Sequence, residues 1–160
     1  MGFKARLPLL AAALWWGSLT AIGFMAVPLL FANLPTPALA GGMAAKLFSA
    51  QTWLSLGCGV VLLYANHSTV RPEPVEGPAQ ASTSSARTEV PARTEAMPVR
   101  TEAWALAGLI LALLVEFAVA PRIVARQNLA LWHSAGSAMY LAQWACAVIA
   151  LWKLSRVGAS

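Results

Sequence analysis

The stretch AWALAGLILALLVEFAVA, residues 103–120, decides the fold. It carries one charged residue, Glu116, in an otherwise apolar run that as a helix crosses most of the ~30 Å hydrocarbon core of a bilayer. Three further apolar runs have a similar character: Leu7–Phe31, Leu47–Tyr64 and Leu129–Trp152. These continuous runs are far longer than the alternating ~10-residue strands of a membrane barrel. The sequence therefore predicts an all-α integral membrane bundle of four transmembrane helices.

The composition excludes a water-soluble fold. The chain is 59% hydrophobic and 11% charged, with a mean hydropathy of +0.65, whereas soluble domains are about 25% charged. The net charge of +5 does not indicate nucleic-acid binding, because the basic residues are scattered and flank the apolar runs instead of forming a patch. The first run is also too long for the apolar region of about 7–15 residues in a signal peptide, so we expect an uncleaved first span.

The apolar runs divide the chain into two predicted transmembrane hairpins, residues 1–65 and 103–160, joined by residues 66–102. The joining segment is rich in Pro, Ser, Thr, Arg and Glu, so it is predicted to be a disordered loop. It repeats the tripeptide Arg-Thr-Glu at residues 87–89, 93–95 and 100–102. An inserted segment is favoured over a binding tail. We expect the first span to end at residues 33–37, with Gly41 and Gly42 continuing the turn, and see no repeat between the two hairpins in the sequence.

The charge distribution predicts the orientation. If both termini and the long loop share one side, that side holds eight Lys and Arg residues: Lys4, Arg6, Arg71, Arg87, Arg93, Arg100, Lys153 and Arg156. The other side holds three: Lys46, Arg122 and Arg126. The positive-inside rule then places the N- and C-termini in the cytoplasm of a bacterium, with the protein in its inner membrane.

Four polar residues are predicted to lie at a similar depth near the outer face. They are Gln51, Thr52, Glu116 and His133. Carboxylates within a span are costly, so a Glu and a His in one layer would suit proton or cation handling. The alternatives are a hydrogen-bonded lock between helices, and an ion pair of Glu116 with Arg122 or Arg126.

The fourth apolar run has small residues at every fourth position. These predict a helix-packing stripe: Ser134, Ala138, Ala142, Cys146 and Ala150. Packing within the bundle is favoured over dimerisation. Cys58 and Cys146 are interpreted as buried small side chains and not as a disulfide framework.

No metal site or cofactor is predicted. The two histidines, His67 and His133, lie near opposite ends of the predicted spans, and no Cys/His cluster has zinc spacing. Methionine ligands for copper are conceivable beside His133, but Met in an apolar span usually packs. Phosphate-binding loops, nucleophile elbows and paired-carboxylate sites are missing, so we predict that the protein is not an enzyme.

The short motifs WWGS at residues 15–18, VPLLF at 27–31, KLF at 46–48, APRI at 120–123 and LWHS at 131–134 resemble the DUF4149 family, also called TMEM205-like. The resemblance covers the four spans but not the repeat-bearing loop. It implies a small four-helix membrane protein of uncharacterised biochemical role. It also implies recurring family positions at Pro28, Phe31, Phe48, Pro121, Arg122 and His133, and it assigns no catalytic residue.

Two functions remain open at this point. The first is a non-enzymatic structural or accessory protein of the inner membrane, and the alternative is a small transporter or a cation- or proton-handling protein that uses the outer polar layer. The expected partners are the lipid bilayer and either another membrane protein or further copies of this chain, with no nucleic acid. Many carriers are built from internal repeats, so the apparent lack of a repeat favours the accessory role.

Overall fold

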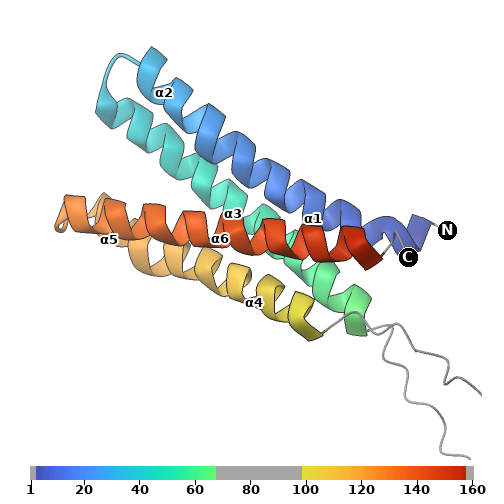
Figure 1. Ribbon diagram of the computed structural model, residues 1–160. Helices are drawn as coiled ribbons and strands as arrows, with labels where there is room; N and C mark the ends of the chain where they lie inside the picture. The colour runs from blue at the N-terminus through green and yellow to red at the C-terminus, as the bar shows by residue number, and fades with distance from the viewer. Residues whose placement is uncertain (1–2, 68–98, 158–160) are drawn as a thin grey trace, which may run out of the picture.

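The first transmembrane helix consists of three consecutive segments. The structure, a computed structural model, describes residues 3–67 and 99–157. Here α1 (Phe3–Ala21) passes into a five-residue π-helical turn, η1 (Ile22–Ala26), and then into α2 (Val27–Asn33). The chain then turns back on itself, so that the first two spans form a hairpin (Figure 1).

The third transmembrane helix is divided in the same way. After α3 (Pro37–His67), the chain continues through α4 (Val99–Leu114), η2 (Val115–Val119) and α5 (Ala120–Val124), and it ends with α6 (Leu129–Val157). The prediction of an all-α fold is confirmed, because every regular element in the described part of the chain is helical.

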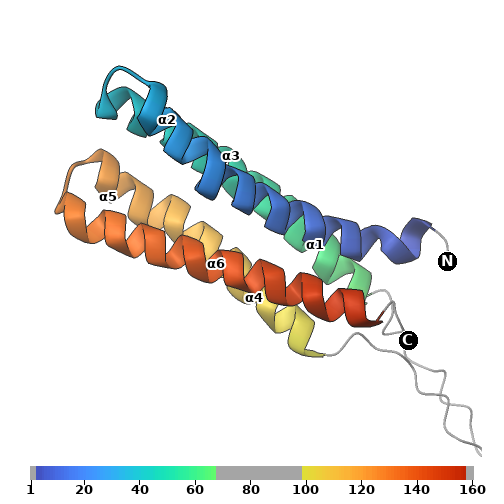
Figure 2. The same ribbon diagram turned by 45° about the horizontal axis from the view of Figure 1, so that its top comes forward.

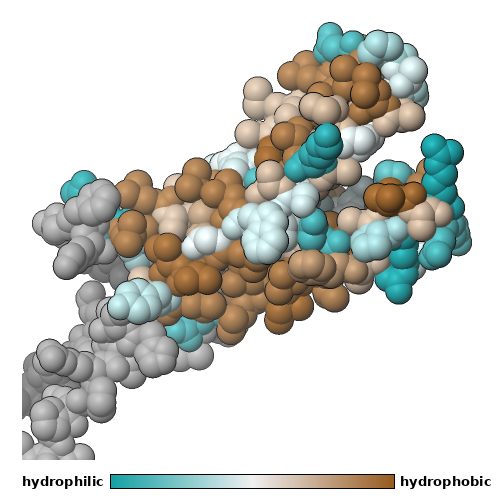
Figure 3. All heavy atoms as spheres, turned by 180° about the vertical axis from the view of Figure 1, so that it is seen from behind, coloured by the Kyte–Doolittle hydropathy of each residue, from teal (hydrophilic) through white to brown (hydrophobic). Residues whose placement is uncertain are grey.

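Four of these helical stretches are long and apolar enough to cross a membrane: Arg6–Asn33, Pro37–Ala65, Thr101–Val124 and Leu129–Arg156. Seen from behind, their surface is mainly hydrophobic, and hydrophilic side chains gather toward the hairpin tips and in the cleft between them (Figure 3). Such a surface suits lipid as its solvent, because in water a large apolar area would be exposed at a cost in free energy.

Several predicted boundaries were wrong. The second span begins at Pro37, ten residues before Leu47, and Gly41 and Gly42 are helical instead of extending the turn. The backbone N–H of Leu39 donates to the Thr36 hydroxyl at 3.3 Å, so Thr36 caps the start of this helix. Pro37 is then the first helical residue, a position where proline is well tolerated.

The two ends of the predicted loop also need correction. The helices α3 and α4 include residues 66–67 and 99–102, which had been assigned to it. Residues 68–98, which carry most of the Arg-Thr-Glu repeats, lie outside the described residues. Past the third span, the helix continues through Pro121 to Val124, so the predicted loop there shrinks to a tight turn in which Arg126 and Asn128 have positive φ angles.

Both π-helical turns have the same local cause. Pro28 and Pro121 each lie two residues after a π turn, and each lacks the N–H that would bond to the carbonyl four residues earlier, on Phe24 or Phe117. A proline ring also clashes with that carbonyl. Widening the preceding turn to π geometry relieves the clash, so each proline accounts for the break in its helix.

The two hairpins match each other position by position, and we call them the first and second repeat. Both prolines follow a five-residue π turn, and they are 93 positions apart. The same offset pairs buried residues of α1 with buried residues of α4, namely Ala12 with Ala105, Trp15 with Gly108 and Leu19 with Ala112. An offset of 92 does so for α3 and α6, namely Gln51 with Gln143, Ser55 with Ala147, Cys58 with Ala150 and Leu62 with Leu154. This correspondence was not apparent from the sequence alone.

Equivalent residues of the two repeats meet between the hairpins. A Cβ atom at Gly108 would lie 2.5 Å from the ring of Trp15, its equivalent in the first repeat, which is fully buried. The rings of Phe48 and Tyr140, 92 positions apart, are edge to face with centroids 5.2 Å apart. Such contacts between equivalent positions indicate an approximate two-fold relation between the hairpins, which lie together near the chain termini and separate toward their turns (Figures 1 and 2).

Candidate functional site

A buried polar layer crosses the middle of the bundle. Gln51 on α3 donates through Nε2 to the hydroxyls of Ser18 on α1 (3.0 Å) and Ser55 (3.2 Å). Gln143 on α6 donates to the same Ser55 hydroxyl at 3.1 Å. Ser55 in turn donates to the Gln51 carbonyl at 2.8 Å. Gln51 thus joins α3 to α1, and the completely buried Ser55 joins α3 to α6.

Gln51 and Thr52 were expected near the outer face, but α3 begins at Pro37, so both lie near the middle of that helix. Gln51 and Thr52 are buried, as expected of residues in an interior layer. The Thr52 hydroxyl donates to the Phe48 carbonyl of its own helix, so it does not join the helices. Gln143 was not among the four residues of the predicted layer, yet it shares the Ser55 hydroxyl with Gln51.

Two further contacts tie α6 to α1. The Tyr140 hydroxyl donates to the Leu19 carbonyl at 2.7 Å, and the Trp144 indole N–H donates to the Thr20 hydroxyl at 2.9 Å. Tyr140 packs on Gly23, where a Cβ would approach its ring to 2.5 Å. A glycine is therefore required at this π turn for the tyrosine to reach α1.

Glu116 lies in the second π turn and is partly buried. Its Oε1 accepts a hydrogen bond of 2.7 Å from the Ser49 hydroxyl on α3, so it links the two hairpins. Its equivalent in the first repeat is Gly23, the glycine beneath Tyr140. The two repeats therefore differ at this position. Gly23 in the first repeat leaves room for the Tyr140 ring, whereas Glu116 in the second repeat presents a carboxylate.

The alternative of an ion pair between Glu116 and Arg122 or Arg126 is not observed in the part of the chain that the structure describes. The Arg122 guanidinium donates to the Ala118 carbonyl of its own helix and lies 4.5 Å from the centroid of the Trp132 ring. A cation over an aromatic ring near a span end is typical of the membrane interface. Arg156 lies over Trp152 in the same way at the opposite end.

His133 does not join the polar layer as predicted. It is exposed on α6, whereas Glu116 faces Ser49 on α3, and no hydrogen bond between His133 and Glu116 is found in the described part of the chain. His133 lies about one turn from the start of α6 and Glu116 about two turns before the end of α5, so the two residues differ in depth as well as in the direction they face. Within residues 3–67 and 99–157, no group of three His, Cys, Asp or Glu side chains has the geometry of a metal site.

The predicted packing stripe on α6 is buried over only part of its length. Cys146 and Ala150 are buried, but Ser134, Ala138 and Ala142 are exposed. An α-helix turns about 100° per residue, so positions four apart drift by about 40° per step and the stripe winds out of the interface. The buried face of α6 instead follows Gln143, Ala147, Ala150 and Leu154. Both cysteines are free.

The positions that the family resemblance singled out have mainly structural surroundings. Pro28 and Pro121 end the π turns, and Phe48 packs edge to face on Tyr140. Phe31 is exposed at the tip of the first hairpin, and Arg122 and His133 are exposed on the second. These positions therefore do not converge on a single site.

Comparison with known proteins agrees with this description. Residues 10–131 match the model of DUF4149, which is described as a domain of unknown function. No curated protein and no solved structure matches the chain significantly. The match covers most of the chain, including both π turns and the Glu116–Ser49 contact. This chain of four membrane-spanning helices therefore belongs to the DUF4149 family.

Proposed function

We propose that this protein is a non-enzymatic accessory protein of the bacterial inner membrane, with both termini in the cytoplasm. The observation that carries the proposal is how its intramembrane polar groups are used. Ser18, Gln51, Ser55 and Gln143 bond to one another across three helices, and Tyr140 bonds to a carbonyl of α1. Side chains bonded to one another in this way hold helices together, and of the four only Gln51 keeps a buried atom, Oε1, without a partner among the described residues.

The distribution of basic residues supports the orientation. Eight of the eleven Lys and Arg residues lie on the side that holds the termini. Fusing a reporter that is active only in the cytoplasm to Ser160, and in a second strain to Leu34 at the first tip, tests this. Activity at Ser160 and not at Leu34 is expected, and the reverse pattern would invert the topology.

A partner surface is supported by the exposed half of the small-residue stripe, Ser134, Ala138 and Ala142. Small side chains in lipid allow another helix to approach closely. A photo-crosslinking amino acid at Ala138 should therefore capture a membrane protein or a second copy, whereas one at Val60, exposed on α3, should capture much less. Equal capture at both positions would argue against this surface.

The second candidate function, cation or proton handling, is supported by one observation. Glu116 is a carboxylate within a span, it lies in a π turn, and its bond is to a neutral hydroxyl. Intramembrane carboxylates and π turns are both frequent at functional sites. It is the weaker candidate, because His133 lies apart from Glu116.

A growth experiment separates the two functions. A strain lacking the gene is grown over a range of metals, pH values and cationic compounds, and it is complemented with wild type, Glu116→Gln or His133→Ala at matched membrane levels. Equal rescue by all three supports the accessory role. Loss of rescue with Glu116→Gln alone, in a protein that remains folded, would favour cation or proton handling.

A further inference from the structure

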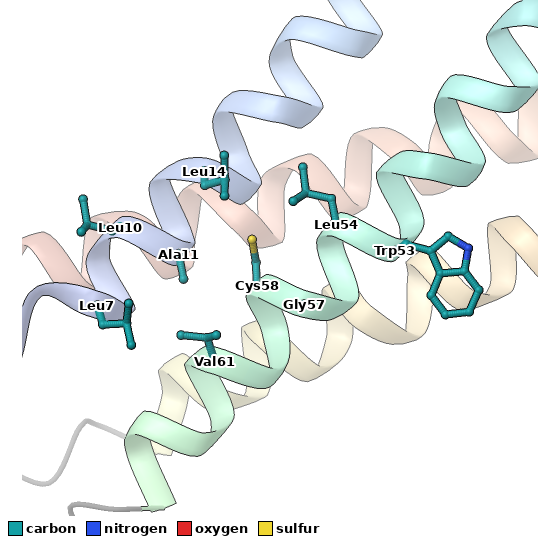
Figure 4. Close-up of a pocket in the computed structure, with 9 residues that line it drawn as sticks. All are labelled: Leu7, Leu10, Ala11, Leu14, Trp53, Leu54, Gly57, Cys58 and Val61. Carbon is teal, nitrogen blue, oxygen red and sulfur yellow. The ribbon is translucent and has the colours of Figure 1, made fainter. Parts of the chain in front are cut away.

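An apolar groove runs between α1 and α3 on the side of the bundle nearer the chain termini. Its volume is about 390 Å³. Figure 4 shows side chains of both helices around it, with the Cys58 thiol directed toward α1 and Ala11 directed toward α3. Its lining is Leu7, Leu10, Ala11, Leu14, Trp53, Leu54, Gly57, Cys58 and Val61. The leucines are exposed and Ala11 and Cys58 are buried, so the groove has an apolar floor and opens outward.

Two residues that line the groove are smaller than their equivalents in the second hairpin. By the offsets that relate the repeats, Gly57 corresponds to Ile149 and Ala11 corresponds to Trp104. A Cβ atom at Gly57 would meet nothing within 4 Å, so the space above it is open. The second hairpin carries the side chains of an isoleucine and a tryptophan at these positions, whereas the first carries only the hydrogen of Gly57 and the methyl group of Ala11. At these two positions the first hairpin leaves space that a larger side chain would fill.

We propose that this groove binds one acyl chain of an anionic phospholipid, which goes beyond the accessory role. The length of the groove favours lipid over a protein helix. It extends along α1 from Leu7 to Leu14, which is about 10 Å at 1.5 Å per residue. An acyl chain within one leaflet spans about 15 Å, half of the hydrocarbon core, whereas a partner helix crosses all ~30 Å and needs a longer groove.

The charge at one end of the groove selects the headgroup. The groove ends at Leu7 and Val61, and the exposed Arg6 directly precedes Leu7. A guanidinium pairs well with a phosphate through two parallel hydrogen bonds. The far end, near Leu14 and Trp53, lies toward the middle of the spans. A phospholipid with its phosphate at Arg6 therefore points its chain along the groove toward the bilayer centre.

The test uses the full chain in bilayers that contain phosphatidylglycerol with a photoreactive diazirine on one acyl chain. After illumination and proteolysis, labelling is mapped by mass spectrometry. We expect residues 7–14 and 53–61 to be labelled several-fold more than the equivalent residues 100–107 and 145–153 of the second repeat. Even labelling of both hairpins would overturn the proposal.

Variants of the groove sharpen the test. Gly57→Ile copies the second repeat and fills the groove, so labelling of residues 53–61 should fall several-fold. Gly42→Ile is the matched control on the same helix, since a Cβ there also meets nothing within 4 Å and the residue lies outside the groove. If Gly57→Ile does not fold, Gly57→Ala, which adds one methyl, should give a smaller fall. Unchanged labelling in the folded variant would refute the proposal.

The headgroup and the competing occupant are tested in the same system. Arg6→Gln should abolish the preference for phosphatidylglycerol over phosphatidylcholine that carries the same photoreactive chain. Equal labelling by the two lipids in the wild type would refute the role of Arg6. Crosslinks between two copies of the chain at residues 53–61, without lipid labelling there, would show that a second copy fills the groove and would overturn the lipid proposal.

Discussion

Ser55→Ala is expected to destabilise the bundle more than any single conservative change at an exposed serine. The Ser55 hydroxyl accepts bonds from Gln51 and Gln143 and donates to the Gln51 carbonyl. Gln51 keeps its bond to Ser18, but the Gln143 amide loses its cross-helix partner while remaining buried. Interhelical hydrogen bonds in membranes average about 0.6 kcal/mol and reach about 1.7, and a newly unsatisfied buried group adds about 1–3 kcal/mol.

The expected loss is therefore about 1–3 kcal/mol in the free energy of unfolding, measured by denaturant titration of the protein in mixed micelles. Ser155→Ala is the control, because its exposed hydroxyl bonds only to the carbonyl of Trp152, and it should cost about 0.5 kcal/mol or less.

A second substitution tests the cause of that loss. In wild type, Gln143→Leu removes a hydrogen bond and should destabilise. In the Ser55→Ala background it removes a stranded amide and should restore part of the lost stability, because replacing both partners by apolar groups is nearly neutral. A loss below about 0.5 kcal/mol for Ser55→Ala, or an additive effect of the two substitutions, would refute this reasoning.

Three more predictions follow from the same contacts. Gly108→Ala should cost about 1–3 kcal/mol because its Cβ would meet the buried Trp15 ring, whereas Gly42→Ala should be neutral or stabilising; equal melting temperatures would contradict this close approach. Glu116→Gln keeps an acceptor for the Ser49 hydroxyl, so its melting temperature should match wild type within experimental error, while Glu116→Leu should lower it. Replacing residues 70–97 by a short Gly/Ser linker should leave insertion and thermal stability nearly unchanged; a large loss of either would contradict the interpretation of the loop as an insertion.

The sequence predicted the elements of this fold because apolar run length alone determines which segments enter a bilayer. It misplaced the start of the second span because Gly41 and Gly42 were taken as turn residues, although glycine is common in transmembrane helices, where the backbone has no water to bond with. It also missed the π turns, even though Pro28 and Pro121 mark both of them.

The candidate site was less predictable, for a geometric reason. Depth along a helix can be counted from the sequence, but rotation about its axis depends on packing. Gln51 is buried near the middle of α3, whereas His133 is exposed about one turn from the start of α6. The link from Ser49 to Glu116 joins residues 67 positions apart and leaves no local signal.

The repeat was hidden for a related reason. In lipid, many apolar residues can replace one another. The two repeats therefore agree in which positions are buried and where the prolines lie, but seldom in which amino acid stands at a given position. Trp15 and Gly108 are equivalent, yet their side chains are the largest and the smallest that occur, because one fills the space that the other leaves.

The approximate two-fold relation has a consequence for how the chain can be assembled. Each hairpin enters and leaves at the same end of the bundle, where both termini also lie (Figure 1). Joining two such units in tandem leaves the direction of every helix unchanged. The two halves, made as separate polypeptides, should therefore insert independently and associate in the bilayer. On this reasoning, the covalent connection between them fixes their ratio at one to one and is not needed to hold them together.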